Sequence, residues 1–469
     1  MSDAQVAESG PADPNDDCPL PVSVQNWNIA CFASYFAIVY LVAPVSYVGL
    51  THANLLRNLG NGDDISNLPG AMYLWMTFIP VVVSWMFPHP RYLKPLAMLS
   101  VGVLALSTAA VAAVLGSDTS PTTRTVVVIA HGALFGAANG FLFTAIWDVM
   151  RRGVSTSRRG KALGFSFGIG PLFACIGSVL QDACFDGKLL GGWTFGLTFP
   201  NNYRAMFAAT APLFLLEGLI LVLSVVPTPS IRDEPQVKPL QEIGRGLLQF
   251  VRNRNVLLAV VIYVIVYSGG NTILSNVSLY ARNVMGEGAD TVGQQNFLRF
   301  GFKAVAGALL GVLLAKVNPR ATLLATTSIL LAGMGWALIS GGWGWPFMMT
   351  FGLLGAGELF GAYFPNYVTT ASAKKYVRIN MAYLGVLSAL TGFSAYGFGM
   401  ISKHFGKIYS ERYSKIYGEI EGHLLGEMQG RIISIYVAAA ILVIGLALIL
   451  LLLPVNPTPR EQEGEASSG

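Results

Sequence analysis

The sequence predicts an all-α membrane protein, and its composition and the spacing of its apolar segments carry that prediction. Of the 469 residues, 53% are hydrophobic and 12% are charged, whereas soluble domains carry about 25% charged residues. Apolar stretches of about 20 residues recur along the chain, and a helix of that length crosses a hydrocarbon core of about 30 Å. We place twelve transmembrane helices at 27–50, 69–87, 93–115, 125–147, 162–180, 203–226, 256–280, 292–315, 322–339, 346–368, 381–401 and 432–453.

The remaining sequence consists of two tails and one long connection. Residues 1–26 contain five acidic residues and no Lys or Arg. That charge does not suit a secretory signal peptide, so we expect a disordered cytoplasmic tail. The connection at 227–255 begins with prolines and continues with apolar residues at helical spacing, which predicts a short amphipathic helix on the inner membrane surface. Residues 454–469 form the second cytoplasmic tail.

Lys and Arg are concentrated in alternate loops. The connections after the even-numbered spans carry most of them, whereas the short loops on the other side carry few. Because cytoplasmic loops are enriched in Lys and Arg, we predict a multi-pass protein of the cell membrane with both termini in the cytoplasm. The net charge of +5 reflects this asymmetry and gives no sign of a nucleic-acid partner.

Two internal similarities indicate a repeated architecture. The run Arg57-Asn58-Leu59-Gly60 after the first span is echoed by Arg282-Asn283-Val284-Met285-Gly286 after the seventh, and the His-Pro-Arg that ends at Arg91 is echoed by the Asn-Pro-Arg that ends at Arg320. The offsets are similar, so we predict two pseudo-symmetric six-helix bundles, at 27–226 and 256–453, with the same topology.

The loop after the eighth span carries a motif. The stretch GVLLAKVNPR runs from Gly311 to Arg320 and resembles the loop signature G-x-L-x-D-R-x-G-R-R of the major facilitator superfamily, with Lys316 also at a matching place. Ala315 stands at the acidic position, and only Arg91 matches in the first half. We expect these basic residues to gate the relative movement of the two halves.

This resemblance implies a rocker-switch transporter, in which two halves tilt about a central cavity lined mainly by spans 1, 4, 7 and 10. In span 5, Gly168, Gly170 and Pro171 are similar to part of the Gly-Pro motif of the superfamily's antiporters. Asp148 precedes a basic cluster at the end of span 4, and we expect it to cap or gate the cytoplasmic end.

Two cations lie inside the eighth span. Arg299 and Lys303 are four residues apart and share one helix face, which Gln295 joins one turn earlier. A charge near the centre of a bilayer costs about 2.5 to 3.5 kcal/mol on insertion scales, so such residues usually face a protein interior or a watery cavity. We expect these three side chains to bind an anionic substrate.

Two acids and one histidine are candidates for proton coupling. Glu358 lies in the glycine-rich span 10, and we expect it to exchange a proton during transport; the alternative is a static ion pair with Arg299 or Lys303. His131 in span 4 is the second candidate, or else a hydrogen-bonded packing residue. For Glu217 in span 6, the sequence leaves open a neutral acid, a hydrogen-bonded acid or an acid turned toward a headgroup.

Further polar residues complete the expected substrate site. Tyr267, Asn271 and Asn276 fall on one broad face of span 7, around Gly269 and Gly270, and Tyr40 lies in span 1. Such groups can bind a polar substrate or hold helices together.

In the long connection at 402–431, glycine recurs at every fourth position from Gly418 to Gly430. We expect it to extend spans 11 and 12 as two closely packed helices, with a flexible loop as the alternative.

The predicted function is secondary active transport of a small polar solute, an organic anion, by proton-coupled alternating access. A proton-driven efflux antiporter and a non-transporting assembly factor or receptor with the same fold are the alternatives. Motifs of phosphate-binding loops, zinc proteases and serine hydrolases are absent from the sequence, so we expect no enzyme activity, no cofactor and no metal site. We expect a monomer in the lipid bilayer whose partners are the solute and a coupling ion, H+.

Overall fold

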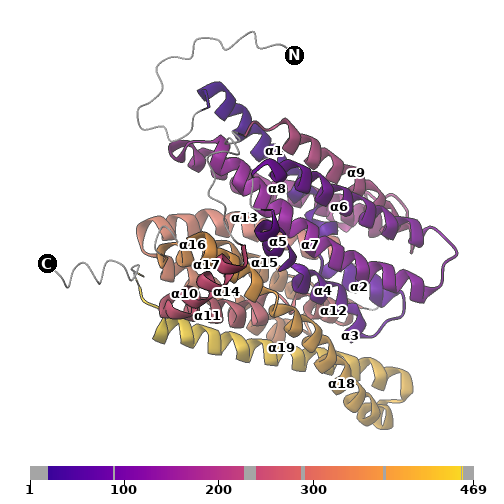
Figure 1. Ribbon diagram of the computed structural model, residues 1–469. Coiled ribbons are helices and arrows are strands. Elements are labelled where there is room, and N and C mark those ends of the chain that lie inside the picture. Colours follow the sequence, from indigo (N-terminus) through magenta and orange to yellow (C-terminus); the bar gives the residue numbers. More distant parts are fainter. Residues whose placement is uncertain are drawn as a thin grey trace.

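The computed structural model describes residues 20–87, 90–226, 239–286, 291–372, 377–455 and 457, apart from some side chains within these ranges. In this part of the chain every regular element is a helix. The helices form two bundles packed side by side, one from each half of the chain (Figure 1). Helix α1 (Val22–Ser46) begins, and α19 (Glu419–Leu452) ends, at one end of the molecule, which we call the terminal end; the opposite end is the distal end.

The first bundle follows the apolar runs of the first half. After α1, its elements are α2 (Leu50–Asn58), α3 (Asp63–Ser66), α4 (Leu68–Met76), α5 (Ile79–Met86), η1 (Pro90–Tyr92), α6 (Leu93–Leu115), α7 (Pro121–Gly153), α8 (Thr156–Phe185), η2 (Lys188–Leu190) and α9 (Asn201–Leu223).

The second bundle ends with α19 and repeats this arrangement. Its earlier elements are α10 (Pro239–Arg252), α11 (Arg254–Gly270), α12 (Leu274–Met285), α13 (Val292–Lys316), α14 (Pro319–Ser340), η4 (Trp345–Met348), α15 (Met349–Gly357), α16 (Leu359–Thr370), α17 (Val377–Ser388) and α18 (Thr391–Tyr417).

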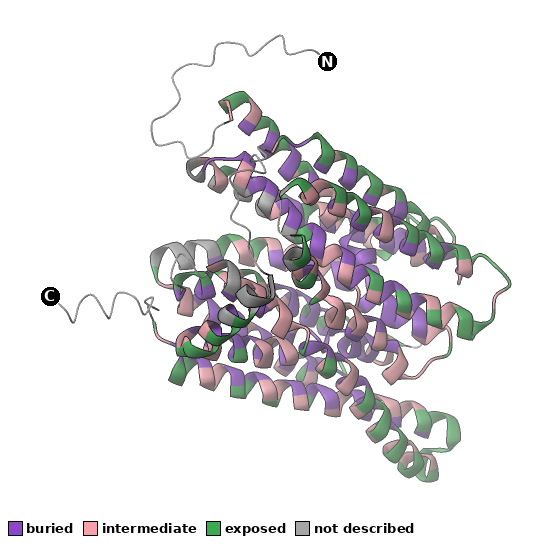
Figure 2. Ribbon diagram, viewed as in Figure 1, coloured by how far each residue is buried: buried purple, intermediate pink, exposed green. Residues whose placement is uncertain are grey.

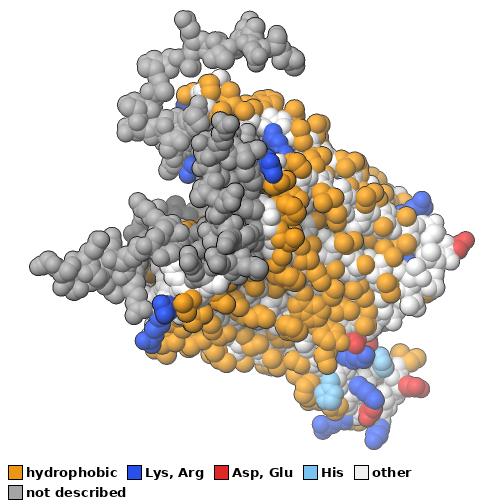
Figure 3. Space-filling model, in the orientation of Figure 1, with side chains coloured by type: hydrophobic (Ala, Val, Ile, Leu, Met, Phe, Trp, Pro, Cys, Tyr) orange, Lys and Arg blue, Asp and Glu red, His pale blue; other side chains and the backbone are white. Residues whose placement is uncertain are grey.

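The outer surface of both bundles is apolar. Ten helical segments of the described residues are long and apolar enough to cross a membrane. The two other expected spans lie within α8 and α13, helices of 30 and 25 residues that include polar stretches. Leu99, Leu106 and Leu309 are at least 65% exposed, and apolar side chains cover most of the face seen in Figure 3. Lipid-facing helices require such a surface, so the chain is an all-α, multi-pass membrane protein.

Span 1 is broken at residues 47–49, shortly after Pro44. A helix break leaves carbonyl groups without an N–H donor, and these groups need other partners. The carbonyl oxygen of Pro44 accepts hydrogen bonds from Thr51 Oγ1 (2.6 Å), Gln181 Nε2 (3.1 Å) and Asn296 Nδ2 (3.2 Å). Since Gln181 lies in the first bundle and Asn296 in the second, this carbonyl joins the two bundles.

Spans 7 and 10 are broken as well. Helix α11 ends at Gly270 and α12 begins at Leu274, so span 7 is interrupted directly after its glycine pair. Span 10 is divided at Glu358, which separates α15 from α16. The acid therefore sits at a helix break rather than inside a regular helix.

The bundles meet through reciprocal helix pairs, α8 with α13 and α4 with α18. The fifth and second spans of one half thus meet the second and fifth spans of the other, as two pseudo-symmetric halves require. Glycines set the separation, because a Cβ at Gly293 of α13 would overlap the backbone of Asp182, and a Cβ at Gly392 of α18 would overlap Trp75.

Helices α18 and α19 continue into a hairpin at the distal end, where exposed and charged residues gather (Figures 2 and 3). The turn between them is Gly418, whose φ of +87° favours glycine. Three glycines of α19 would overlap α18 if they carried a Cβ: Gly422, Gly426 and Gly430. The prediction of two closely packed helical extensions at 402–431 is confirmed, and the flexible-loop alternative is wrong.

Helix α10 lies in the expected connection between the bundles. Phe250 is buried, with its ring centroid 5.1 Å from that of Tyr383, whereas Leu247 and Val251 are about half exposed. The side chain of Ile243 lies outside the described residues. The helix thus docks on the second bundle through one face.

Candidate functional site

The two cations of span 8 and the acid of span 10 meet inside the second bundle. Arg299 Nε lies 2.6 Å from Glu358 Oε1, and Lys303 Nζ lies 2.5 Å from Glu358 Oε2. All three residues are less than 10% exposed. Each carboxylate oxygen therefore accepts from a different cation, and we call this group the charged triad.

The glycine run of span 10 brings Glu358 to the cations. A Cβ at Gly355 would overlap the backbone carbonyl of Arg299, and one at Gly352 would overlap the ring of Phe302. A Cβ at Gly357 would overlap Leu330 of α14. Only glycine allows α15 to approach α13 this closely, as the sequence predicts for a small-residue run.

Two aromatic rings border the triad. Arg299 Cζ lies 5.5 Å from the ring centroid of Tyr47 and 5.4 Å from that of Phe300. For Lys303 Nζ the corresponding distances are 5.9 and 5.3 Å. Electron-rich ring faces stabilise the cations by about 0.5 to 2 kcal/mol each without neutralising them. Tyr47 comes from the first bundle, so the triad lies beside the interface between the halves.

The charges of the triad do not cancel, since two cations face one carboxylate. The alternative to proton exchange was an ion pair between Glu358 and one of the cations. In the structure Glu358 pairs with both. One positive charge remains at a site shielded from water. Such a site favours an added anion, because the attraction is poorly screened there.

Two of the five other expected substrate-binding residues, Gln295 and Asn276, form hydrogen bonds that connect helices. Gln295 accepts from Ser278 Oγ (2.5 Å) and donates to Thr291 Oγ1 (2.9 Å). Asn276 donates to Ser434 Oγ (3.1 Å) and accepts from Asn67 of the first bundle (2.6 Å). Both side chains are fully buried. These contacts hold helices together, which was the alternative for such groups.

The other three expected residues of spans 1 and 7 are Asn271, Tyr267 and Tyr40. Asn271 lies in the break of span 7, and its Oδ1 has no hydrogen-bond partner among the described residues. The rings of Tyr267 and Tyr263 lie 5.2 Å apart. Tyr40 packs on Gly170, where a Cβ would overlap its ring. Asn271 thus offers a buried amide oxygen that has no hydrogen-bond partner among the described residues.

His131 is buried inside the first bundle. Its Nδ1 lies 3.1 Å from Ser107 Oγ, and its ring stacks on that of His52 at 5.3 Å and meets Phe135 and Phe207 edge-on. These contacts are those of the packing alternative, and they bring His131 together with His52 rather than with the triad. A proton-coupling role for His131 stays a prediction.

The residues of the loop motif are only partly described. The side chains of Asp148 and Lys316 lie outside the described residues, and so do the contacts of Gly311. Arg320 donates to the carbonyl of Leu450 on α19, and Arg91 Cζ lies 4.6 Å from the ring centroid of Tyr92. These contacts do not test the expected gating role of the loop residues, which stays a prediction.

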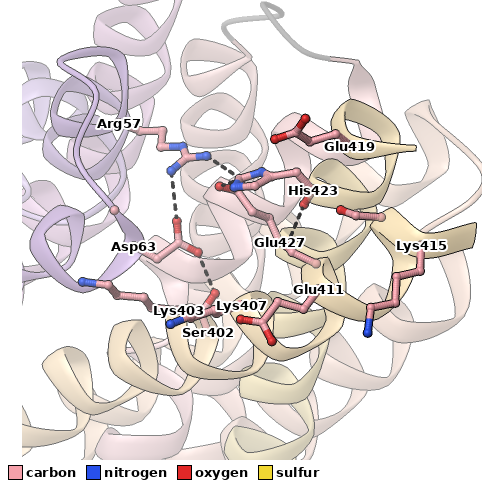
Figure 4. A pocket seen from close by; sticks show the side chains of 14 residues that line it. Arg57, Asp63, Ser402, Lys403, Lys407, Glu411, Lys415, Glu419, His423 and Glu427 are labelled. Atoms are coloured by element: carbon pink, nitrogen blue, oxygen red, sulfur yellow. Dashed lines mark hydrogen bonds and ion pairs between the residues drawn. The ribbon is translucent and has the colours of Figure 1, made fainter. Parts of the chain in front are cut away.

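A second charged group, which the sequence analysis missed, joins the halves at the distal end (Figure 4). Asp63 of α3 accepts from Arg431 of α19 at 2.9 and 2.8 Å and from Ser402 of α18 at 2.6 Å. Arg57 pairs with Glu427 beside it. We call Arg57, Asp63, Glu427 and Arg431 the distal network, and it borders a pocket of about 850 Å³ under the hairpin.

One signal for the distal network was present in the sequence. The repeated Arg-Asn pairs after spans 1 and 7 face each other across the halves, because Arg282 Nη1 donates to Asn58 Oδ1 at 2.7 Å. Arg431 likewise donates to Asn283 Oδ1 at 2.5 Å. The repeat therefore marked the contact region, but Asp63 and Arg431 are separated by 368 positions, and nothing in their own surroundings pairs them.

The comparisons with known proteins agree with this architecture. The profile described as Major Facilitator Superfamily matches residues 185–408. No curated protein matches the chain.

Several solved transporter structures share the fold. A bacterial homologue of the human lysosomal transporter Spinster, inward-facing and unoccupied, has a TM-score of 0.60 at 14% identity over 92% of this chain and 97% of its own. The nucleoside transporter NupG gives 0.58 at 10% identity, covering 91% and 99% of the two chains. A D-xylose-proton symporter gives 0.59 at 13% identity, covering 92% and 97%.

The family and these folds indicate a membrane transporter rather than an enzyme. With the two bundles and the reciprocal contacts between them, the profile match over residues 185–408, just under half of the chain, makes this protein similar to transporters of the Major Facilitator Superfamily, of no assigned subfamily.

Proposed function

We propose that the protein is a secondary active transporter of a small organic anion, which binds to Arg299 and Lys303. The observation that carries this proposal is the charged triad, in which two buried cations share one carboxylate. Buried charges are retained in membrane helices mainly where they serve a pathway or a ligand. Residues 27–226 and 256–453 are the two moving halves in this proposal, joined by 227–255, with both termini in the cytoplasm and the protein in the cell membrane.

Charge balance gives Glu358 its role in the proposal. An anion that approaches Arg299 and Lys303 competes with Glu358 for the same hydrogen-bond donors. Once it is displaced from the cations, the buried carboxylate is destabilised and takes up a proton, which couples anion binding to proton movement. A proton-driven antiporter would instead bind the anion and the proton in alternation, so a proton-gradient experiment separates import by symport from efflux by antiport.

The test begins with ligand discovery on the purified full-length protein. Thermal unfolding is measured with carboxylates, phosphate esters, nucleosides, sugars and peptides, since a ligand that binds the folded state raises the midpoint. We expect anions to raise it and neutral solutes to leave it unchanged. Proteoliposomes then show whether the anion accumulates in response to a proton gradient, which a non-transporting receptor would not support.

Removal of either cation tests the site itself. Lys303→Gln and Arg299→Gln each remove a charged hydrogen bond of about 1.5 to 3 kcal/mol, so we expect anion affinity to fall roughly 10- to 150-fold. Lys407→Gln, on the exposed face of the hairpin, is the matched control and should bind as the wild type does. If both triad variants accumulate the anion at the wild-type rate, the proposal is wrong.

A further inference from the structure

Glu217 is a buried acid with no role in the proposed anion site. It lies on α9 and is 2% exposed, and its Oε1 has no hydrogen-bond partner among the described residues. None of the ion pairs in this part of the chain includes it. An ionised carboxylate in such surroundings is strongly destabilised, whereas a neutral carboxylic acid is tolerated.

The groups that face Glu217 supply no positive charge. Tyr35 and Tyr47, from α1 and the break that follows it, are the ionisable neighbours on that side. Lys94 of α6 donates to the carbonyls of Val222 and Ser224, at the C-terminal end of α9. His131 of α7 contacts α9 at Phe207, ten positions earlier in the helix. The carboxyl thus differs from Glu358, which two cations hold.

A small cavity adjoins this acid. Its volume is about 10 Å³, and Glu217 lines it together with Ser46, Tyr47 and Asn139 and with apolar side chains of α1, α7 and α9. About one water molecule needs 10 to 15 Å³ and two to four polar partners. The cavity reaches the lower limit of this volume and offers polar partners, so it has room for one water beside the carboxyl.

Tyr47 places this cavity next to the charged triad. The same residue that lines the cavity holds its ring 5.5 Å from Arg299 Cζ and 5.9 Å from Lys303 Nζ. Tyr47 therefore borders both the cavity of the lone acid and the charged triad. Charges inside a protein are poorly screened, so a change of charge at one of these sites can affect the other.

We infer that Glu217 is a second proton-binding site, whose occupancy is linked to the anion site on the far side of Tyr47. The inference rests on the proposed function. The positive charge of the triad makes ionisation of Glu217 less unfavourable than it would be beside a neutral site. An anion neutralises that charge, so Glu217 then binds a proton more tightly, and by reciprocity a protonated Glu217 strengthens anion binding.

Infrared spectroscopy of the purified full-length protein tests this without any substrate. A neutral carboxyl group gives a C=O band that an ionised one lacks. We expect a band in the wild type that is lost in Glu217→Gln and kept in Glu411→Gln, a control on the exposed hairpin. A band that survives Glu217→Gln, or no band in the wild type, overturns the inference.

The linkage has its own readout. In Lys303→Gln the empty site carries no net charge, so we expect the band to persist to higher pH than in the wild type. Succinate and lactate, the anionic probes, should strengthen the wild-type band at fixed pH. If neither probe binds but the band behaves as described, the anion proposal fails and the proton site stands; an unmoved midpoint in Lys303→Gln overturns the linkage.

A conservative substitution keeps the inference testable if Glu217→Gln does not fold. Should Glu217→Gln not yield folded protein, Glu217→Asp retains an acid one methylene shorter. A band shifted in frequency in that variant then supports the assignment to Glu217, and an unshifted band overturns it.

Discussion

Glu358 contacts both Arg299 and Lys303, so each of these side chains depends on the other two for its buried charge to be tolerated. The sequence predicted all three as members of a site, since charges stand out within apolar spans. It did not predict that Glu358 binds both cations at once. That geometry depends on the break at Glu358 and on the closeness of α15 to α13, over a separation of 59 positions.

At the same scale we predict that Glu358→Gln is less stable than the wild type. The substitution leaves two buried cations without a counter-charge, and loss of one partner of a buried pair costs about 3 to 5 kcal/mol. Anions should restore part of the loss, because they can replace the carboxylate. Thermal unfolding of purified protein with and without succinate measures both effects, with Glu411→Gln as the control.

For transport, Glu358→Gln should retain anion exchange and lose proton-driven accumulation.

The stability prediction has its own contradicting outcome. Equal unfolding midpoints for this variant and the wild type in the absence of anion would show that the three charges do not depend on one another.

The glycines of α13, α15 and α19 determine how closely the helices approach, and this is where prediction at the scale of elements was strongest. The run around Gly355 predicted tight packing, and the repeat from Gly418 to Gly430 predicted the hairpin. Neither pattern predicted which helix packs against the glycines, because a small residue indicates only that another element approaches closely. The break of span 1 was also missed, although Pro44 was visible in the sequence.

We predict that Gly355→Ala destabilises the protein by about 1 to 3 kcal/mol, the usual effect of overpacking. The added Cβ must displace the carbonyl of Arg299, which moves α15 from α13 and strains the contact between Arg299 and Glu358. Gly335→Ala is a matched control, since a Cβ at Gly335 of α14 meets nothing within 4 Å.

At this half-buried position inside a helix, the control change should be neutral or stabilising by up to about 1 kcal/mol. Chemical denaturation of both variants compares them, and equal midpoints would contradict the packing argument.

For the molecule as a whole, the distal network closes one end of the interface between the halves. Alternating access requires that this end open in the other state. Asp63 must then leave Arg431, and both would need water or new partners. The sequence predicted two halves and their order, from the repeats and the apolar runs, but the meeting surface depends on residues far apart in the chain. The sequence therefore did not predict which residues join the halves. Only the fold shows the contact of Asp63 with Arg431 and the donors to the Pro44 carbonyl.

We predict that Asp63→Asn shifts the protein toward the state that is open at the distal end. Cys175 reports on this change, because it lies at the interface, with its Sγ 3.9 Å from the carbonyl oxygen of Phe297 on α13. In a background where Cys18, Cys31 and Cys184 are replaced by Ser, maleimide should modify Cys175 faster in Asp63→Asn than with Asp63 intact.

A tenfold change in rate corresponds to about 1.4 kcal/mol in the opening equilibrium. Glu411→Gln in the same background is the control. A rate unchanged by Asp63→Asn would show that the network does not hold the distal end closed.

The hairpin of α18 and α19 has a practical consequence for imaging the protein. A transporter of 50.1 kDa with little mass outside the bilayer gives particles that are hard to align in electron micrographs. The hairpin is stiffened by its glycine contacts, and its tip presents Ile420 at 90% exposure beside charged side chains. A nanobody raised against this tip would provide a rigid fiducial, and its fixed angle to the second bundle would reveal how far the first bundle tilts.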